Sequence, residues 1–343
     1  MTRPALAALA LSALLALSAI TALGVGAATV PVADVIGVLA RRLHLIAGEN
    51  VTVLADRIVW QLRLPRVVAA AAVGAALALC GVVLQSLTRN ELADPYLLGL
   101  SNGAAVGAVT VLVFGVGVGA ATRGVAVGVG AFVGALAALA LVLALATGRS
   151  GELPPSRTIL AGVAVGQLAG AYTSLAIIVF GERDAARQVL TWTLGSFAGV
   201  RWPSALVLLA LAVATTASVL WCARSLDAFA FGEVSARSLG VPVTTLRWTL
   251  LVGCALVTAG TVAVVGPIGF VGLTVPHIVR LLVGPGHAAL LPLSALTGAV
   301  LMLAADTAAR TVAGAQEIPV GVVTAAIGAP VLVWLLRRQA RRS

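Results

Sequence analysis

Long apolar runs recur along this sequence and constrain its fold more than any other feature. Each run is close to the roughly 20 residues that a helix needs to cross the hydrocarbon core of a bilayer. The runs lie near residues 4–28, 65–86, 93–113, 124–146, 158–180, 203–222, 248–266, 271–284, 290–308 and 319–336. They predict an all-α integral membrane protein with about ten transmembrane helices, forming a single transmembrane domain over residues 1–343.

The charge composition supports a membrane location and excludes several kinds of enzyme. Charged residues make up 10% of the chain, whereas a soluble domain carries about 25%. All 22 basic residues are arginine. A P-loop ATPase needs the lysine of its phosphate-binding loop, and a Schiff-base enzyme needs a lysine amine. If ATP drives this protein, another chain must bind the nucleotide.

The arginines also indicate an orientation. An even number of spans puts both termini on one side, and the arginine-rich C-terminal tail argues that this side is the cytoplasm. The first apolar run is longer than the h-region of a signal peptide, so we expect it to be retained as a span. Arginine in place of every lysine suggests a GC-rich bacterial genome. We therefore expect a multi-pass protein of the bacterial cytoplasmic (inner) membrane with both termini in the cytoplasm.

The sequence contains no recognisable catalytic or metal-binding motif. His44, His277 and His287 lie far apart, and none belongs to a metalloprotease pattern or accompanies a nucleophile elbow. The three cysteines are widely spaced in apolar stretches, which is typical of buried free thiols. Asp306 is the best candidate for an intramembrane proton relay, but Arg310 four residues later favours a local ion pair. We predict no catalytic or metal-binding residue and disfavour ion-coupled transport.

Glycine recurs at every fourth position in two of the predicted spans. The third span carries Gly99, Gly103 and Gly107, and the fifth carries Gly162, Gly166 and Gly170. Small residues at this spacing let helix backbones approach closely in lipid. The pattern fits packing within the chain, a subunit interface or the lining of a pathway, and the sequence leaves these alternatives open.

Two arginines flank a proline at the predicted start of the second span. Proline is favoured at the first position of a helix, so we expect this span to begin at Pro65, with Arg63 and Arg66 at its N-terminus. The helix dipole disfavours cations there, and Asp56 is the nearest acid in the sequence. Either an anionic group from outside the chain balances these arginines, or they are solvated at the interface or reach lipid headgroups.

The segment near 223–247, between the sixth and seventh spans, is predicted to form a short cytoplasmic helix. Glu233 and Arg237 are spaced for an i,i+4 ion pair, and Gly240 with Pro242 forms a helix stop. The apolar side chains of this segment are Phe229, Phe231, Val234 and Leu239. They suit a membrane surface and a groove in a soluble partner equally well.

Several ordered stretches resemble the FecCD family, the permeases of binding-protein-dependent ABC importers for iron complexes and vitamin B12. The resemblance covers about residues 31–338. The matching stretches are residues 63–66, 74–77, Gly81, Gln85, 89–95, 98–104, 232–240, 269–280, 317–324 and 328–330. The resemblance implies a bundle of ten helices that pairs with a second permease, either an identical chain or a paralogue. It also implies two ATPase subunits on the cytoplasmic side and a substrate-binding protein outside, with no role for nucleic acid.

The resemblance also assigns roles to individual residues. Binding-protein docking is implied at Arg63, Arg66 and Arg310. ATPase coupling is implied at Gly232, Glu233, Ser235, Ala236, Arg237, Leu239 and Gly240. A cytoplasmic gate is implied at Asn90, Leu92, Pro155 and Ser156, and the pathway or subunit interface at Gly162, Gly166, Gln167 and Gly170. Glu91 and Pro155 depart from the family's pattern, so the resemblance does not define the gate in detail.

The expected function is passage of an iron complex across the membrane by alternating access. Ferric siderophore is the first expectation for the cargo, and haem and cobalamin are alternatives. ATP and magnesium would be bound by the partner ATPase, and no cofactor is expected on this chain, which is a transport subunit and not an enzyme. An ion-coupled secondary transporter is the alternative from a different class.

Overall fold

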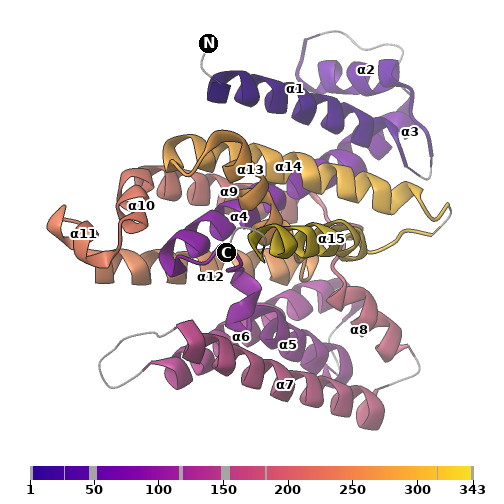
Figure 1. The fold of residues 1–343 in the computed structure, drawn as a ribbon. Helices are drawn as coiled ribbons and strands as arrows, with labels where there is room; N and C mark the ends of the chain where they lie inside the picture. The colour runs from indigo at the N-terminus through magenta and orange to yellow at the C-terminus, as the bar shows by residue number, and fades with distance from the viewer. Residues whose placement is uncertain are drawn as a thin grey trace.

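The computed structural model describes residues 3–26, 28–45, 52–115, 119–147, 155–181, 184–314 and 316–340, and in these residues all regular structure is helical (Figure 1). Ten helices correspond to the ten predicted apolar runs. They are α1 (Arg3–Gly24), α4 (Leu64–Thr88), α5 (Leu100–Phe114), α6 (Ala120–Ala146), α7 (Pro155–Phe180), α9 (Trp202–Trp221), α12 (Val243–Val265), α13 (Val271–Val283), α14 (His287–Thr311) and α15 (Val320–Ala340). The all-α prediction is confirmed.

Not all of these helices have the full length of a membrane span. Among the described residues, seven helices are long and apolar enough to cross a bilayer, and Leu100–Phe114, Val271–Val283 and Val320–Leu335 are shorter apolar helices. The third span was expected from residue 93, but α5 begins only at Leu100. A 3-10 turn, η2 (Pro95–Leu98), precedes α5, and Gly99 has a φ of 77°. Glycine adopts this left-handed backbone conformation readily, and Gly99 separates the turn from the helix.

Shorter helices connect the spans. They are α2 (Val32–Arg42), α3 (Val53–Asp56), the π-helix η1 (Arg57–Arg63), α8 (Ala185–Thr193), α10 (Ala223–Ala230) and α11 (Glu233–Ser238). The last two form a hairpin that projects from one end of the bundle (Figure 1). The predicted short helix is therefore present as α11, and it ends before Gly240 as expected.

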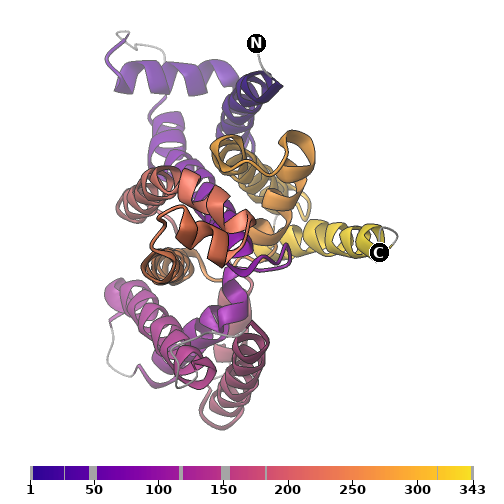
Figure 2. The same cartoon turned by 60° about the vertical axis from the view of Figure 1, so that its left-hand side comes forward.

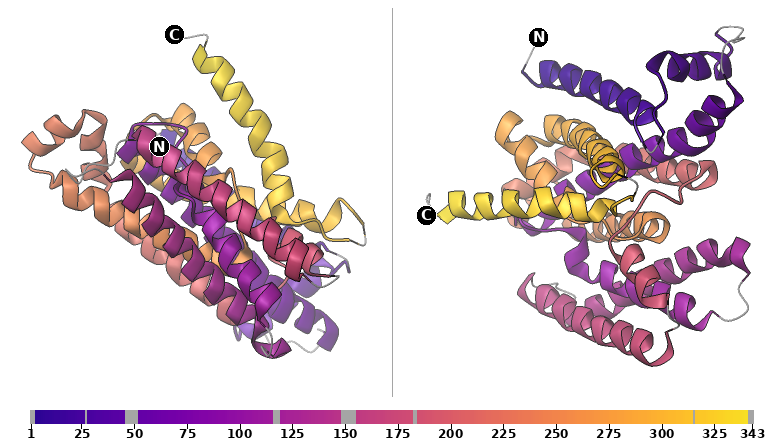
Figure 3. Two further views of the ribbon diagram at one scale, coloured as in Figure 1. Left: turned by 90° about the horizontal axis from the view of Figure 1, so that it is seen from below. Right: turned by 90° about the vertical axis from the view of Figure 1, so that its right-hand side faces the viewer.

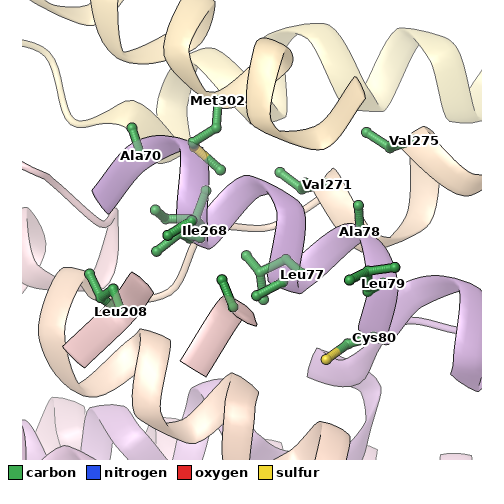
Figure 4. Close-up of a cluster of buried hydrophobic side chains, with 14 of the residues drawn as sticks. Ala70, Leu77, Ala78, Leu79, Cys80, Leu208, Ile268, Val271, Val275 and Met302 are labelled. Carbon is green, nitrogen blue, oxygen red and sulfur yellow. The ribbon is translucent and has the colours of Figure 1, made fainter. Parts of the chain in front are cut away.

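Helix α4 occupies the centre of the bundle, where it packs against α9, α12, α13 and α14 (Figure 2). Close approach depends on glycines, because a β-carbon at Gly74 would overlap the carbonyl oxygen of Gly298 on α14. A β-carbon at Gly81 would overlap the carbonyl oxygen of Gly272 on α13 in the same way. Figure 4 shows the side chains around α4, with Ala70, Leu77, Ala78, Leu79 and Cys80 from α4, Leu208 from α9, Val271 and Val275 from α13, and Met302 from α14.

A second group of helices, α5, α6 and α7, packs together beside the α4 group (Figure 1). In α5, β-carbons at Gly103 and Gly107 would overlap carbonyl oxygens of Gly134 and Gly130 on α6. The glycine stripe of the third predicted span therefore serves packing within the chain. On α7, Gly166 faces the side chain of Asn102.

The predicted start of the second span at Pro65 is wrong. Residues 53–88 form one continuous helical run in which the π-helix η1 precedes α4. The N–H of Leu64 donates to the carbonyl oxygen of Val59, five residues earlier. Proline has no N–H and its ring crowds the preceding turn of an α-helix, and a π segment supplies a wider turn at that point. Arg63 and Arg66 consequently lie within a helix and do not flank a helix N-terminus.

Helix α15 projects from the bundle toward the C-terminus (Figure 3). Its exposed apolar residues include Ile327, Val333 and Trp334, with 46%, 50% and 52% of their surface accessible. The segment before α15 lies beside the end of α14.

Candidate functional site: two polar ends of the bundle

Arg66 is the centre of an ion-pair cluster at one end of the bundle. Its Nε lies 3.0 Å from Asp306 Oδ1 and its Nη2 lies 2.9 Å from the same atom. Its Nη1 donates to Glu317 Oε2 at 2.9 Å. Asp306 lies on α14 with 1% of its side chain exposed, whereas the side chain of Glu317 is 44% exposed. Arg66 therefore joins α4 to α14 and to the segment that precedes α15.

Arg310 and Arg63 bind the C-terminal end of α1. Arg310 pairs with Asp306 at 3.2 Å, and its Nη1 and Nη2 donate to the carbonyl oxygens of Val25 and Ala22 at 3.1 Å. Arg63 donates from Nη1 to the carbonyl oxygen of Leu23 at 2.7 Å. The last carbonyl groups of a helix have no partner within it and carry partial negative charge. The two guanidinium groups therefore satisfy the end of α1.

The arginine cluster is defined as Arg63, Arg66, Arg310, Asp306 and Glu317. It corrects the expectation for Arg66, whose charge is balanced by acids of the chain itself. Asp306 and Glu317 are 240 and 251 residues from Arg66 in sequence, so sequence proximity could not reveal them. The local pair between Asp306 and Arg310 is confirmed. The three arginines do gather at one end, but they are only 5–9% exposed. Their implied docking role remains a prediction.

The opposite end of α4 faces the hairpin of α10 and α11. Gly232 and Gly240 have φ angles of 93° and 81°, which glycine adopts without a steric penalty. These two residues bracket α11. Three large apolar side chains of the hairpin are exposed: Phe231 at 75%, Val234 at 80% and Leu239 at 68%.

Two further residues of the hairpin, Phe229 and Ala236, are buried. The sequence analysis placed Phe229 on the apolar surface offered to a partner and Ala236 among the residues of ATPase coupling. Phe229 is 2% exposed and Ala236 is 0% exposed. They face the bundle and position the exposed part of the hairpin. A partner surface is therefore restricted to the residues that project outward.

Glu233 has a partner that sequence reasoning missed. Its carboxylate contacts Arg247 of α12 closely, whereas Arg237, the expected i,i+4 partner, lies 4.0 Å away. The main ion pair of Glu233 therefore ties α11 to the adjacent span. Arg237 is left with 63% of its side chain exposed.

The implied gate segment follows directly on α4. The Oδ1 atom of Asn90 accepts a hydrogen bond from the Leu92 N–H at 2.9 Å. Glu91 lies 3.2 Å from His277 Nδ1 and 3.7 Å from Arg280, both on α13. Glu91, the residue that departs from the family's pattern, therefore places the gate segment beside Arg280 and His277 of α13.

The remaining implied residues lie on α7. Pro155 and Ser156 begin this helix, but their side chains lie outside the part of the structure that is described. Gly162 is buried, whereas Gln167 and Gly170 are exposed. The exposed pair offers a surface for a subunit contact or a pathway, and neither role is tested by the geometry.

Residues 14–338 match the model of the FecCD transport family. The chain belongs to the FecCD transport family. The resemblance found in the sequence is thereby confirmed. The Gly81–Gly272 and Gly74–Gly298 contacts give a packing reason for two of the matching motifs.

Similar FecCD proteins are named as permeases of import systems. The vitamin B12 import system permease protein BtuC of Salmonella paratyphi A is 41% identical over 313 residues, which are 88% of this chain and 93% of the relative. The cobalamin import system permease protein BtuC of Halobacterium salinarum is 44% identical over 287 residues, or 82% and 74% of the two chains.

A solved structure described as an inward-facing conformation of a metal-chelate type ABC transporter has a similar fold. Its TM-score is 0.81 at 30% identity, with 96% of this chain and 98% of that chain covered. The chain is therefore a multi-span permease subunit of an ABC importer of the FecCD type. No group of three or more possible metal-ligating side chains occurs among the residues that the structure describes.

Proposed function

We propose that this permease passes cobalamin across the cytoplasmic membrane of a bacterium. The observation that carries the proposal is its similarity, over most of its length, to permeases named for vitamin B12 or cobalamin import. The ferric siderophore expected from the sequence becomes the second candidate. It is favoured by the fold shared with a metal-chelate type transporter, and haem follows it.

The surface of α7 is compatible with a bulky cargo of either kind. Between Arg157 and Phe180 this helix carries no charged residue. Its exposed positions include Leu160, Gln167 and Gly170. Such a wall provides few fixed polar contacts, and binding sites obtain specificity from precisely placed polar groups. Selection of the cargo is accordingly assigned to the binding protein.

The cargo is identified by reconstituting the permease in vesicles with its ATPase and its binding protein. Binding protein loaded with cyanocobalamin is compared with binding protein loaded with a ferric siderophore or haem. We expect cyanocobalamin to stimulate ATP hydrolysis and to accumulate in the vesicles. Stimulation by a ferric siderophore alone would replace cobalamin with the second candidate.

The α10–α11 hairpin is proposed as the docking site of the ATPase, which puts this end of the bundle in the cytoplasm. Phe231, Val234 and Leu239 form an exposed apolar surface beyond the bundle, suited to a groove in a soluble partner. The ATPase would bind ATP and magnesium, and this chain would bind no cofactor. A disulfide crosslink from a Val234→Cys variant to the ATPase tests the assignment.

The arginine cluster is proposed as the docking site of the binding protein, through Arg66. Of the two acids that pair with Arg66, only Glu317 is substantially exposed. An acidic side chain of the binding protein can therefore compete with Glu317, while Asp306 remains paired. Arg63 and Arg310 are satisfied by α1 and would act mainly by holding Arg66 and α14 in place.

Alternating access is the proposed mechanism, with two permease subunits around the pathway and the ATPases moving the hairpins. The second permease is either a copy of this chain or a paralogue. The rival from another class is an ion-coupled carrier. Vesicles that contain the permease alone distinguish the two, because cargo accumulation driven by an ion gradient without an ATPase would contradict the ABC mechanism.

A further inference from the structure

Three polar side chains from distant parts of the sequence meet between α4, α10 and α14. Ser86 lies in the last turn of α4, His287 is the first residue of α14, and Asp227 lies on α10. Ser86 Oγ is 2.7 Å from His287 Nε2, and His287 Nδ1 is 2.6 Å from Asp227 Oδ1. The side chain of His287 is 6% exposed. The buried imidazole therefore bridges a hydroxyl and a carboxylate, and the side chain of Asp227 is 43% exposed.

Asp227 also holds the start of α14. Its Oδ1 accepts the backbone N–H of His287 at 2.9 Å, and Gly286, the residue before α14, supplies no side-chain cap. The first N–H groups of a helix need an acceptor from outside the helix, and a carboxylate also opposes the positive end of the helix dipole. Helix α10 thus caps α14 through Asp227.

The end of α4 where Ser86 lies is connected to the implied gate. The neighbouring Gln85 donates from Nε2 to the carbonyl oxygens of Gly272 and Leu273, both at 3.3 Å. Helix α4 ends at Thr88, and Asn90 begins the gate segment. A displacement of the last turn of α4 would therefore move the gate segment and α13 together.

Helix α10 has an apolar anchor as well as this polar connection. Leu226 and Phe229 are 0% and 2% exposed, and α10 packs on α4, α9 and α14. Apolar contact is non-directional, so it permits sliding or rotation of α10. Hydrogen bonds weaken steeply when distance or angle changes. The polar chain is therefore the part of this interface that responds to a rotation of the hairpin.

We propose that Ser86, His287 and Asp227 form a positioning chain that transmits movement of the α10–α11 hairpin to α4 and α14. The inference rests on the proposed docking of the ATPase at this hairpin. The three residues are positioning residues, because they act through the helices that they connect and not by contact with the cargo or the nucleotide.

Variants can break the chain at either end. Ser86→Ala removes the α4 end, and Asp227→Ala removes the α10 end. His287→Asn keeps a donor near the position of Nδ1 and loses the contact with Ser86, so it should resemble Ser86→Ala. Thr88→Ala is a matched control, because the Thr88 hydroxyl donates to the carbonyl oxygen of Leu84 on its own helix, at 2.7 Å.

The readout is cargo transported per ATP hydrolysed by the complete importer in vesicles. We expect each broken chain to lower this ratio by about tenfold, which corresponds to about 1.4 kcal/mol, close to the net contribution of one hydrogen bond. Residues of one network are not additive. The Ser86→Ala/Asp227→Ala double variant should therefore transport as much cargo per ATP as the single variant with the lower ratio. Thr88→Ala should keep the wild-type ratio.

The proposal is overturned if Ser86→Ala and Asp227→Ala both keep the wild-type ratio, or if Thr88→Ala lowers it equally. Loss of ATPase co-purification in both Ser86→Ala and His287→Asn would also overturn it, since a purely structural role would then suffice. Where only Asp227→Ala does not assemble, the transport ratios of Ser86→Ala and His287→Asn decide the proposal. Failure of the ATPase crosslink at Val234→Cys in an otherwise unchanged permease identifies a failure of the proposed docking site instead.

Discussion

The arginine cluster buries charged groups and pairs them within the chain, whereas the α10–α11 hairpin exposes large apolar groups. The two regions lie at opposite ends of α4, since Arg66 and Ser86 are 20 residues apart on it, or about 30 Å along a helix. At the arginine cluster a partner must displace Glu317 before it can pair with Arg66. At the hairpin a partner finds Phe231, Val234 and Leu239 already accessible. Residue type alone therefore does not indicate where a partner can bind.

Charged side chains are used differently in the arginine cluster and at the α10–α11 hairpin. In the arginine cluster, three arginines against two carboxylates leave one formal positive charge, and carbonyl groups of α1 receive part of it. At the hairpin, Asp227 holds the start of α14 and Glu233 holds α12. Charged side chains connect helices at both ends, and both ends carry partly exposed acids: Glu317 at 44%, Asp227 at 43% and Glu233 at 39%.

The largest expected effect is on the buried acid of the arginine cluster. Asp306→Ala leaves Arg66 and Arg310 without their shared carboxylate, and breaking a buried pair costs about 3–5 kcal/mol. We expect a large fall in the thermal stability of the detergent-purified permease, measured by the loss of monodisperse protein on heating. Glu317→Ala is the matched control, because its half-exposed carboxylate should cost less than about 1 kcal/mol. Equal losses in the two variants would contradict the burial argument.

The second effect concerns the apolar surface of the hairpin. Val234→Asp places a charge on an exposed apolar side chain of α11, and hot-spot residues of an interface contribute about 2 kcal/mol or more. We expect ATPase affinity to fall about 30-fold, measured by titration of the ATPase against permease in nanodiscs. The control is Ser238→Ala, which loses a bond to the Val234 carbonyl oxygen on the same helix. Unchanged ATPase binding by Val234→Asp would remove the hairpin from the interface.

A smaller effect of opposite sign is expected at the other end. Glu317→Gln removes the exposed competitor for Arg66 and keeps the side-chain size, so the binding protein should bind more tightly. Exposed ion pairs contribute about 0–1 kcal/mol, which limits the gain to about fivefold. Surface plasmon resonance with the permease in nanodiscs measures it. Weaker binding would indicate that Glu317 itself contacts the binding protein.

The smallest expected effect distinguishes the two partners of Glu233. Arg247→Ala removes the close contact with α12, whereas Arg237→Ala removes only a contact of 4.0 Å. We expect Arg247→Ala to reduce cargo transported per ATP by about twofold, in line with a partly exposed pair of about 0.5 kcal/mol. Arg237→Ala should change it less, unless Arg237 binds the ATPase directly. A larger loss in Arg237→Ala would support that direct contact.

Local sequence predicted the helices because each depends on neighbouring residues. A run of about 20 apolar residues specifies a spanning helix, since every backbone polar group in lipid must be satisfied within the segment. Gly240 predicted the end of α11, because the positive φ found there suits glycine. Pro65 was misleading, because the π-helical turn before it depends on the surrounding packing as well as on the proline.

The sequence was sufficient to determine the membrane-spanning all-α architecture, the family and the position of α11, because these follow from apolar length, glycine placement and ordered motifs. Tertiary structure alone decided which polar side chains meet across different helices. Arg66 meets Glu317 and Ser86 meets His287 across 251 and 201 residues. A hydrogen bond requires its donor and acceptor within about 3.2 Å, and an ion pair requires its charged atoms within about 4 Å. Sequence spacing carries no information on such distances once residues lie on different helices. The burial of Arg63, Arg66 and Arg310 was decided in the same way, by the packing of α1 against α14.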